Sequence, residues 1–442
     1  MQDFKNAVEK NKQLILDAER YIWNHAETGY KEFQTSAYME EKFKELGYEL
    51  TMAEGITGFY TTLDTGKEGP TVLVLGELDS IICPEHPEAN PETGAVHSCG
   101  HNAQCAALLG VAAALKEPGI LDKFCGKIML CAVPAEELLE IEFRSELRNQ
   151  GKIQFFGGKG EFLARGYFDD VDLAFMVHTT TSGYTVRGGS VGCLAKKITY
   201  KGKASHAGGS PWNGNNALYA ATTGLSAVNA LRETFQEKDI IRVHPIITKG
   251  GSMVNAIPGE VKIESYVRGT SFEGMVRENK KVNRAFIGGA LSLGTNIEIT
   301  DFPGYAPLTN CKELMDLCRE ACETILPEHE FTYSDAIGSG STDMGDLSCV
   351  MPVVHPYSAG ATGTSHGADY YITDPQKACV DCAKWQLEML YLLLKDSGAR
   401  AKEIKASYEA PFTIKEYIAY MESLYQSSER ITYGANEVKI LL

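Results

Sequence analysis

Residues 71–79 read TVLVLGELD, and this stretch decides the fold class. Its first residues are apolar and largely β-branched, which is typical of a strand buried on both faces, and it ends in acidic residues. Two similar runs follow, KIMLCAVPAEE at 127–137 and DLAFMVHT at 172–179. Between the first two lies a small-residue helical segment, AALLGVAAAL at 106–115. Buried strands that alternate with helices predict a doubly wound α/β domain.

The pattern changes after residue 191. Residues 193–204, CLAKKITYKGKA, alternate apolar and polar side chains, as a strand with one buried face does. From there the order is strand, helix, two strands, helix, strand, which is the βαββαβ arrangement. The sequence therefore predicts an α+β domain at 192–305, inserted into an α/β domain formed by 1–191 and 306–442. The last part of the chain, beyond residue 400, is a C-terminal extension without recognisable chemistry.

The composition excludes several classes of protein. Hydrophobic residues make up 44% and charged residues 23% of 442 residues, so the chain is neither disordered nor fibrous. The net charge of −16, without a long basic run, argues against nucleic acid as a partner. No stretch reaches the roughly 18 apolar residues that span a membrane. The charged N-terminus MQDFKNAVEKNKQ is unlike a signal peptide, so we expect a cytoplasmic protein whose twelve cysteines are free thiols.

Five side chains of types that bind transition metals lie near the ends of the buried strands. They are Cys99 and His101 in HSCGHN at 97–102, Glu137 and His178 at strand ends, and His366 in GTSHGADYY at 363–371. Thiolate and imidazole are strong ligands for zinc-like ions. Because a doubly wound sheet places its sites beyond the carboxyl ends of its strands, we expect the five to converge. Five ligands suit two metal ions that share a bridging group.

The adjacent carboxylates Glu136 and Glu137 follow one of these strands directly. Neighbouring side chains in an extended chain point in opposite directions, so one carboxylate can bind metal while the other faces the substrate as a general base. Taken singly, each candidate has another explanation: a solvated acidic pair, a hydrogen-bonded core histidine, or a thiol in a helix-capping loop. Their common position at strand ends favours the metal site.

Other motifs point more weakly to function. Cys379 and Cys382 have the spacing of a redox pair, but they open a long amphipathic helix, which favours core packing. The Gly-rich GSGSTDMG at 338–345 matches neither a P-loop nor a dinucleotide-binding fingerprint. Cys99 is better placed as a metal ligand beside His101 than as the nucleophile of a cysteine protease.

From about residue 10 to residue 400, the chain resembles the metal-dependent amidohydrolases and exopeptidases related to aminoacylase, carboxypeptidase G and the plant auxin-conjugate hydrolases. The stretches that carry the resemblance are HSCGHN, AVPAEE, the His178 strand, GKASHAGGSPWNGNNAL at 202–218, GGSMVNAIPGE at 250–260, VRG at 267–269, GSTDMGDLSCVMPVVHPY at 340–357 and TSHGADY at 364–370. GSTDMGD with HPY, together with Asn102 after CGH, looks closest to the branch that contains p-aminobenzoyl-glutamate hydrolase and the aminoacylase-like dipeptidases.

The resemblance implies a role for each candidate in the α/β domain. The metal ligands would be Cys99, His101, Glu137, His178 and His366. They would hold two divalent ions, zinc or manganese, with Cys99 as a candidate bridge between them. Glu136 would act as the general base on metal-activated water.

The resemblance also implies roles for the inserted domain. His206 would reach across a homodimer into the partner's site, and Asn255 and Arg268 would hold the substrate's carboxylate, which an arginine binds with two hydrogen bonds. A hairpin could bring Asn255 and Arg268 together. The edge strands of the inserted domain could pair across the dimer axis, and the glycines within 188–192 could form a hinge.

The implied function is metal-dependent hydrolysis of an amide bond in an N-acyl or aroyl amino acid, or in a dipeptide-like conjugate. Two alternatives stay open: a catalytically inactive homologue that binds or scaffolds, and an exopeptidase that acts on longer peptides. The intact ligand set and Glu136 argue against the first. The auxin-conjugate branch has Asp and His where this chain has Asn102 and Gln104, and Asn102 cannot supply charge to orient a ligand histidine.

Overall fold

The apolar run at 71–79 forms a central strand that is buried on both faces, as predicted. In the computed structural model, which describes residues 2–442, this strand is β3 (Thr71–Glu77). Because successive side chains of a strand alternate, Val72 and Val74 pack into one hydrophobic core, whereas Leu73 and Leu75 pack into another on the opposite face. All four are at most 1% exposed, so β3 needs helices on both sides.

A six-stranded mixed sheet surrounds β3. Its strands, in spatial order, are β1 (Thr51–Met52), β2 (Phe59–Asp64), β6 (Lys127–Val133), β3, β7 (Leu173–Phe175) and β19 (Val353–Val354). The four strands from β6 to β19 run parallel, and β1 and β2 form an antiparallel edge. The carboxyl ends of the parallel strands therefore meet at one edge of the sheet.

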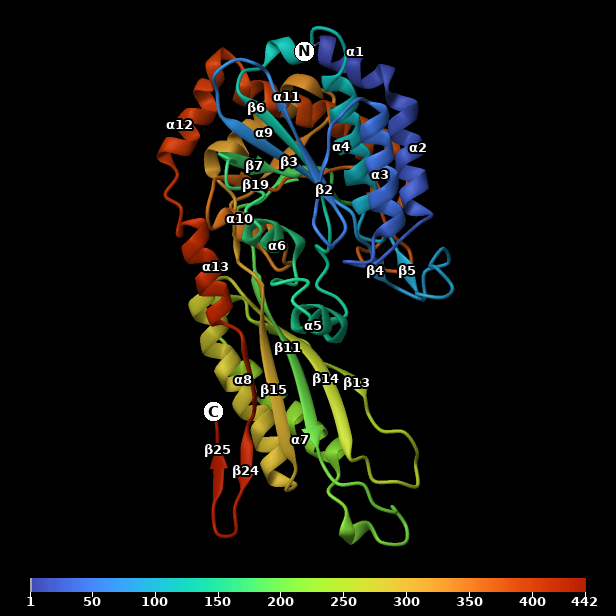
Figure 1. Ribbon diagram of the computed structural model, residues 1–442, viewed down its shortest axis with the longest axis vertical. Coiled ribbons are helices and arrows are strands. Elements are labelled where there is room, and N and C mark those ends of the chain that lie inside the picture. The colour runs from blue at the N-terminus through green and yellow to red at the C-terminus, as the bar shows by residue number, and fades with distance from the viewer. Residues whose placement is uncertain (1) are drawn as a thin grey trace.

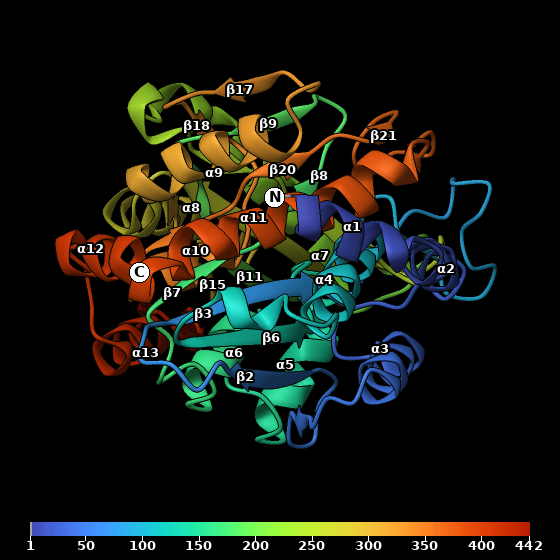
Figure 2. The ribbon, with the colours of Figure 1, turned by 90° about the horizontal axis from the view of Figure 1, so that it is seen from above.

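Helices cover both faces of this sheet (Figure 2). One face packs against α1 (Gln2–Lys10), α2 (Lys12–Trp23), α3 (Phe33–Glu45), α4 (His101–Leu115), α9 (Lys312–Ile325) and α11 (Cys382–Leu394). The other face packs against α6 (Gly158–Ala164), α10 (Met344–Ser348) and α13 (Ile414–Ser423). The prediction of a doubly wound α/β fold is confirmed, and we call this part the α/β body.

Residues 192–305, here called the insertion, form a second sheet that extends away from the α/β body (Figure 1). Its strands, in spatial order, are β12 (Arg242–Val243), β14 (Glu260–Gly269), β11 (Gly192–Lys201), β15 (Asn296–Tyr305) and β23 (Gln426–Glu429), and β13 (Ile246–Lys249) also pairs with β14. One face packs against α7 (Ala217–Ala230) and α8 (Phe272–Ser292). The predicted α+β character and βαββαβ order are present.

The C-terminal extension differs from the sequence prediction, which assigned it wholly to the α/β part. It begins with α12 (Ala399–Ser407), and α13 then packs against the α/β body. The chain next enters the insertion, where β23 pairs with β15, and ends in a hairpin of β24 (Ile431–Tyr433) and β25 (Val438–Ile440). Figure 1 shows this segment running along both parts of the molecule.

Short strands near the connection between the two parts lie at or beside the site described below. They are β8 (His178–Thr179), β9 (Tyr184–Val186), β10 (Gly189–Ser190), β16 (Leu308–Thr309), β17 (Phe331–Tyr333), β18 (Ile337–Gly338) and β20 (Tyr357–Ser358). The glycines here allow close backbone contacts: a Cβ on Gly189 would lie 2.0 Å from the carbonyl oxygen of Leu308.

Candidate active site

The predicted metal ligands gather where the parallel strands of the α/β body end. Cys99 and His101 lie at the N-terminus of α4, Glu136 and Glu137 follow β6, His178 begins β8, and His366 lies in the loop before α11. The left-handed backbone of Gly100, with φ of 89°, turns the chain sharply between Cys99 and His101. This is the position that the doubly wound topology favours for a site.

Cys99 lies at the centre of the cluster. Its Sγ atom is 3.4 Å from Nε2 of His178 and 3.3 Å from Nε2 of His366, and the latter nitrogen is 3.1 Å from Oε1 of Glu137. Two sets of side chains could each hold a metal ion: Cys99 with His101 and His178, and Cys99 with Glu137 and His366. Cys99 belongs to both sets, as a ligand that bridges two ions would.

The polar atoms of the cluster fit bound cations. Nε2 of His101 and Oε1 of Glu137 are buried and make no hydrogen bond, and their neighbours are other candidate ligand atoms: Oε2 of Glu77 at 3.2 Å and Nε2 of His366 at 3.1 Å. Burial and Glu137 favour the neutral thiol of Cys99, but His178 and His101 outweigh them and lower its pKa to about 6. The thiolate is the form that binds metal. The donor set of thiolate, imidazole and carboxylate suits zinc-like ions.

Hydrogen bonds from the protein orient two of the histidines. Nδ1 of His178 is 2.7 Å from the carbonyl oxygen of Thr179, and Nδ1 of His101 is 2.9 Å from the carbonyl oxygen of Asp79. A carbonyl oxygen only accepts, so each Nδ1 carries the proton. Each Nε2 lone pair is therefore left for a metal, which is the arrangement found around bound ions.

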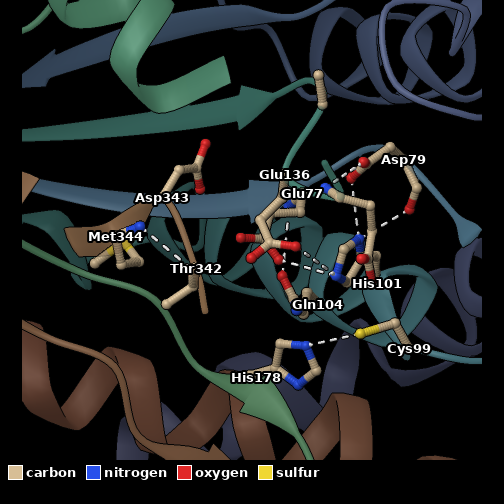
Figure 3. Close-up of polar contacts among 12 residues, drawn as sticks. Glu77, Asp79, Cys99, His101, Gln104, Glu136, His178, Thr342, Asp343 and Met344 are labelled. Carbon is tan, nitrogen blue, oxygen red and sulfur yellow. Dashed lines mark hydrogen bonds and ion pairs between the residues drawn. The ribbon is translucent and has the colours of Figure 1, made fainter. Parts of the chain in front are cut away.

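Glu136 lies beside the ligand cluster without belonging to either set that contains Cys99. Its Oε2 atom is 3.9 Å from Nε2 of His101 (Figure 3). Burial, together with the carboxylates of Glu77 and Glu137, raises the pKa of Glu136 well above its ordinary range. A carboxylate that binds a proton more readily than an exposed one suits the role of a general base.

Four further residues of the site were not found from the sequence. Asp79 contacts both Nδ1 of His101, at 3.1 Å from Oδ1, and the backbone N–H of Glu137, which donates to Oδ2 at 2.8 Å. Nζ of the fully buried Lys159 lies 2.5 Å from both Glu77 and Asp343. Glu77, His101 and Glu136 also lie close enough together to hold a metal ion, but Glu77 is already paired with Lys159. The acidic end of TVLVLGELD was the sequence signal for Glu77 and Asp79, and Lys159 had none.

Asn102 and Gln104, the two departures from the auxin-conjugate pattern, form hydrogen bonds with Glu19 and Glu77. Asn102 points away from the ligands and donates from Nδ2 to Glu19 of α2 at 2.8 Å. Gln104 accepts a hydrogen bond from the backbone N–H of Glu77 at 3.4 Å. The charge that orients His101 comes from Asp79 instead.

A cavity of about 490 Å³ opens onto the ligand cluster between the α/β body and the insertion. Its lining includes Cys99, Glu136, Glu137, His178 and His366 from the body and Cys193, Tyr266 and Arg268 from the insertion. The Gly-rich stretch at 338–345 contributes Gly338, Gly340, Ser341 and Thr342. This volume is typical of a site for a small molecule.

His206 and Asn255 lie together at the far end of the insertion. His206 pairs with Ala256, and the carbonyl oxygen of Asn255 accepts from the backbone N–H of Ala207 at 2.9 Å. Strand β14 separates them from Arg268, and its eight steps from Glu260 to Arg268 span about 26 Å at ~3.3 Å per residue. The expectation that a hairpin brings Asn255 beside Arg268 is therefore wrong within one chain.

The remaining motif belongs to the core. Cys379 and Cys382 are buried free thiols in the helical segment that packs against α4 and α9.

No helix among residues 2–442 combines the length and apolar character needed to cross a membrane.

Comparison with known proteins assigns the family. The description "Peptidase family M20/M25/M40" matches residues 73–391. The chain is 32% identical over 292 residues to the Xaa-Arg dipeptidase of Mus musculus, covering 64% of this chain and 62% of that protein. It is 28% identical over 312 residues to one of the subunits of the p-aminobenzoyl-glutamate hydrolase of Escherichia coli (strain K12), covering 66% and 58%. The chain thus spans about 60% of the length of these curated relatives.

The fold has solved counterparts as well. A dinuclear metal-binding peptidase from the M20 family of Bacillus subtilis superposes with a TM-score of 0.62 at 18% sequence identity, covering 87% of this chain and 99% of that one. At this identity the likeness concerns the fold. With the match over residues 73–391, the protein belongs to the peptidase family M20/M25/M40.

Proposed function

We propose that the protein hydrolyses an amide bond in an N-acyl or aroyl amino acid, or in a dipeptide-like conjugate, with two divalent metal ions, zinc or manganese, as cofactors. The observation that carries this proposal is the ligand cluster around Cys99, which opens with Glu136 onto one small-molecule cavity. Relatives named for dipeptide and aminobenzoyl-glutamate hydrolysis support it. The cavity volume suits a small conjugate of this kind.

Each ion would be held by three side chains. Cys99, His101 and His178 would hold one, and Cys99, Glu137 and His366 would hold the other. When bound, the ions supply Lewis acidity that polarises a carbonyl and makes water acidic. The protein's own contribution is to fix the Nε2 lone pairs of His101 and His178 toward this position through their Nδ1 hydrogen bonds.

Glu136 would move the proton. In this proposal its carboxylate takes a proton from the attacking water and returns it to the nitrogen of the leaving amine. The raised pKa of Glu136, caused by burial and by Glu77 and Glu137, favours the first transfer. The hydroxyl of Tyr305 donates to the backbone carbonyl of Glu136 and so fixes the segment that carries this carboxylate.

His206 would act from a second copy of the chain in a homodimer. Its Nδ1 atom accepts from the backbone N–H groups of Gly208 and Gly209 at 3.1 and 2.8 Å, so a neutral ring carries its proton on Nε2. This exposed N–H could donate to the oxygen that becomes negative in the transition state. Asn255, which lies beside His206, would arrive with it and meet a substrate carboxylate held by the other subunit's Arg268.

Exposed apolar side chains on the insertion support the homodimer. They are Tyr219 on α7, Ile246 and Ile247 on β13, and Met253 and Val254 in the following loop. Val254 is fully exposed, and β13 is an edge strand with all four residues exposed. A symmetric partner could cover this edge and these side chains together.

We further propose that residues 192–305 fold as one domain, which forms the dimer and moves as a lid, while 1–191 and 306–425 form the other; the C-terminal strand β23 and the hairpin after it belong with the insertion. Residue 1 lies outside the described part of the chain. A cytoplasmic location also fits, because the twelve cysteines are free and disulfides are rare in that compartment.

Substituting each of the two adjacent glutamates by glutamine tests the proposed function and separates their roles. Glu136→Gln should keep bound metal and lose about 10²–10⁴ in kcat toward p-aminobenzoyl-glutamate or an Xaa-Arg dipeptide, the usual size of a general-base contribution. Glu137→Gln should lose metal as well, since it removes a ligand. A chelator should abolish hydrolysis by the wild type. Equal metal content in the two variants would contradict these roles, and full activity after chelation would contradict the function.

A further inference from the structure

Two arginines in the cavity have no acidic partner. Within residues 2–442, the guanidinium groups of Arg187 and Arg268 make no ion pair and no hydrogen bond, although both line the cavity. Six other arginines pair with carboxylates of the protein, and among the arginines that do not, only Arg187 and Arg268 line the cavity. In a chain with a net charge of −16, carboxylates are abundant, so these two cations are left for an anion from outside.

Arg187 is held rigidly by its backbone. It lies between β9 and β10, which pair with β17 and with β16 and β18 respectively. Its carbonyl oxygen accepts from Nδ2 of Asn310 at 2.7 Å, and the backbone N–H of Asn310 donates to the next carbonyl, that of Gly188, at 3.0 Å. These hydrogen bonds fix the backbone from which the Arg187 side chain extends.

The guanidinium of Arg187 lies on the His178 side of the cavity. Its Nη1 atom is 3.7 Å from the position that a Cβ would take on Gly338. Its charge partly offsets the effect of burial, which raises the pKa of Tyr357 to about 12. The ring of Tyr357 is 5.7 Å from that of His178, so Arg187 approaches the ligand cluster from this side.

Arg268 lines the same cavity and lies near the segment that carries the adjacent glutamates. Its guanidinium lies 5.5 Å from the ring centroid of Tyr266, and the hydroxyl of Tyr266 donates to the carbonyl oxygen of Leu138, the residue after Glu137. One cation therefore stands near His178 and the other near the adjacent glutamates. Two separate anionic groups of one ligand can reach them.

Two buried hydroxyl groups belong to residues that line the same cavity. Ser190 and Ser341 line the cavity, and their Oγ atoms are buried without a hydrogen-bond partner; Ser190 as a whole is only 7% exposed. Ser190 lies three residues after Arg187, in β10. Hydroxyl groups without a partner, in residues that line a cavity with an unpaired arginine, are candidates for hydrogen bonds to a bound carboxylate.

We propose that Arg187, with Ser190 and Ser341, forms a second carboxylate subsite, so that the preferred substrate carries two carboxylates, as a conjugate of a dicarboxylic amino acid does. This inference rests on the proposed amide hydrolysis and on Arg268 as the first carboxylate site. A conjugate of arginine would place a like charge beside Arg187 and bind poorly. The subsite thus sets this chain apart from a relative named for Xaa-Arg dipeptides.

Binding to an inactive variant tests the subsite directly. In the Glu136→Gln background with metal bound, calorimetry should find that N-benzoyl-glutamate binds at least tenfold more tightly than the isosteric N-benzoyl-glutamine. N-benzoyl-arginine should bind more weakly than either. Adding Arg187→Gln should remove the preference for glutamate, whereas Arg268→Gln should weaken the glutamate and glutamine conjugates alike.

Arg284→Gln provides the matched control, because Arg284 is an exposed arginine on α8 outside the cavity and should leave the ratio unchanged. Equal binding of the glutamate and glutamine conjugates would overturn the subsite, as would a ratio unaffected by Arg187→Gln. If the ratio behaves as expected but the metal-loaded wild type hydrolyses none of the three, the subsite stands and the proposed function fails.

Discussion

Cys99 shows how far a single residue could be interpreted from the sequence. A thiol and an imidazole two residues apart after a buried strand indicated metal binding, as did Glu137 and the histidines at strand ends. Their convergence depends on the tertiary fold, since Cys99 and His366 are separated by 267 positions and meet at 3.3 Å. The topology rule for doubly wound sheets predicted the edge at which they meet, but not the contacts.

Lys159 marks the limit of prediction at the residue scale. In the sequence FFGGKGEF it resembles an exposed loop lysine, because lysine is almost never fully buried unless paired. Its partners, Glu77 and Asp343, come from segments 82 and 184 positions away. Only the folded chain brings the three together, so no local pattern could have indicated the ion pairs.

Lys159→Met should strongly destabilise the protein. The substitution leaves the buried carboxylates of Glu77 and Asp343 without their cation, and breaking a buried pair typically costs about 3–5 kcal/mol. Urea denaturation should show this loss in the free energy of unfolding. The matched control is Lys405→Met, which removes an exposed ion pair with Asp172 and should cost at most about 1 kcal/mol. Equal effects of the two substitutions would refute the structural role of Lys159.

Among the elements, the buried strands and the insertion were predictable, and β23 was not. Apolar runs and alternation reveal strands whose side chains enter a core, as those of β3 and β11 do. Strand β23 reads QSSE and has no such pattern. It pairs with the open backbone edge of β15, and the hydroxyl groups of Thr300 and Ser427 are hydrogen-bonded at 2.9 Å. An open backbone edge has no sequence pattern of its own, so this pairing could not be predicted.

The C-terminal extension should stabilise the insertion through Ile431. This side chain is 1% exposed and packs into the core beneath α7 and α8. Ile431→Ala should lower the local stability by about 2–5 kcal/mol and speed amide hydrogen exchange in β15. Ile440→Ala, at an exposed position of the same hairpin, should change stability by less than about 0.5 kcal/mol. Unchanged exchange in β15 after Ile431→Ala would contradict this packing role.

At the scale of the whole molecule, the length of the insertion separates two sets of predicted residues. Arg268 lines the cavity, whereas His206 and Asn255 lie at the far end of the same sheet. The sequence could not show this, because the distance depends on β14 running straight for ten residues. A site that needs all of them requires a second copy of the chain, which agrees with the exposed apolar side chains around β13.

Subunit complementation tests this arrangement. His206→Ala and Glu136→Gln should each be inactive alone, but mixed under conditions that exchange subunits they should regain activity. A mixed dimer then has one site in which both groups are intact. As a control, the double variant mixed with wild type should form mixed dimers without an active site. No recovery in proven mixed dimers of the single variants would place His206 outside the partner's site.

The central claim is that Cys99 joins two metal sites in each chain, and metal content per chain tests it most directly. Elemental analysis of the purified protein should find two divalent ions per chain in the wild type. His178→Ala and His366→Ala should each retain about one, because each removes a ligand of a different set. Cys99→Ala, which removes a ligand common to both sets, should retain fewer ions than either histidine variant. A wild type that binds no ion, or a Cys99→Ala variant that keeps both, would contradict the account.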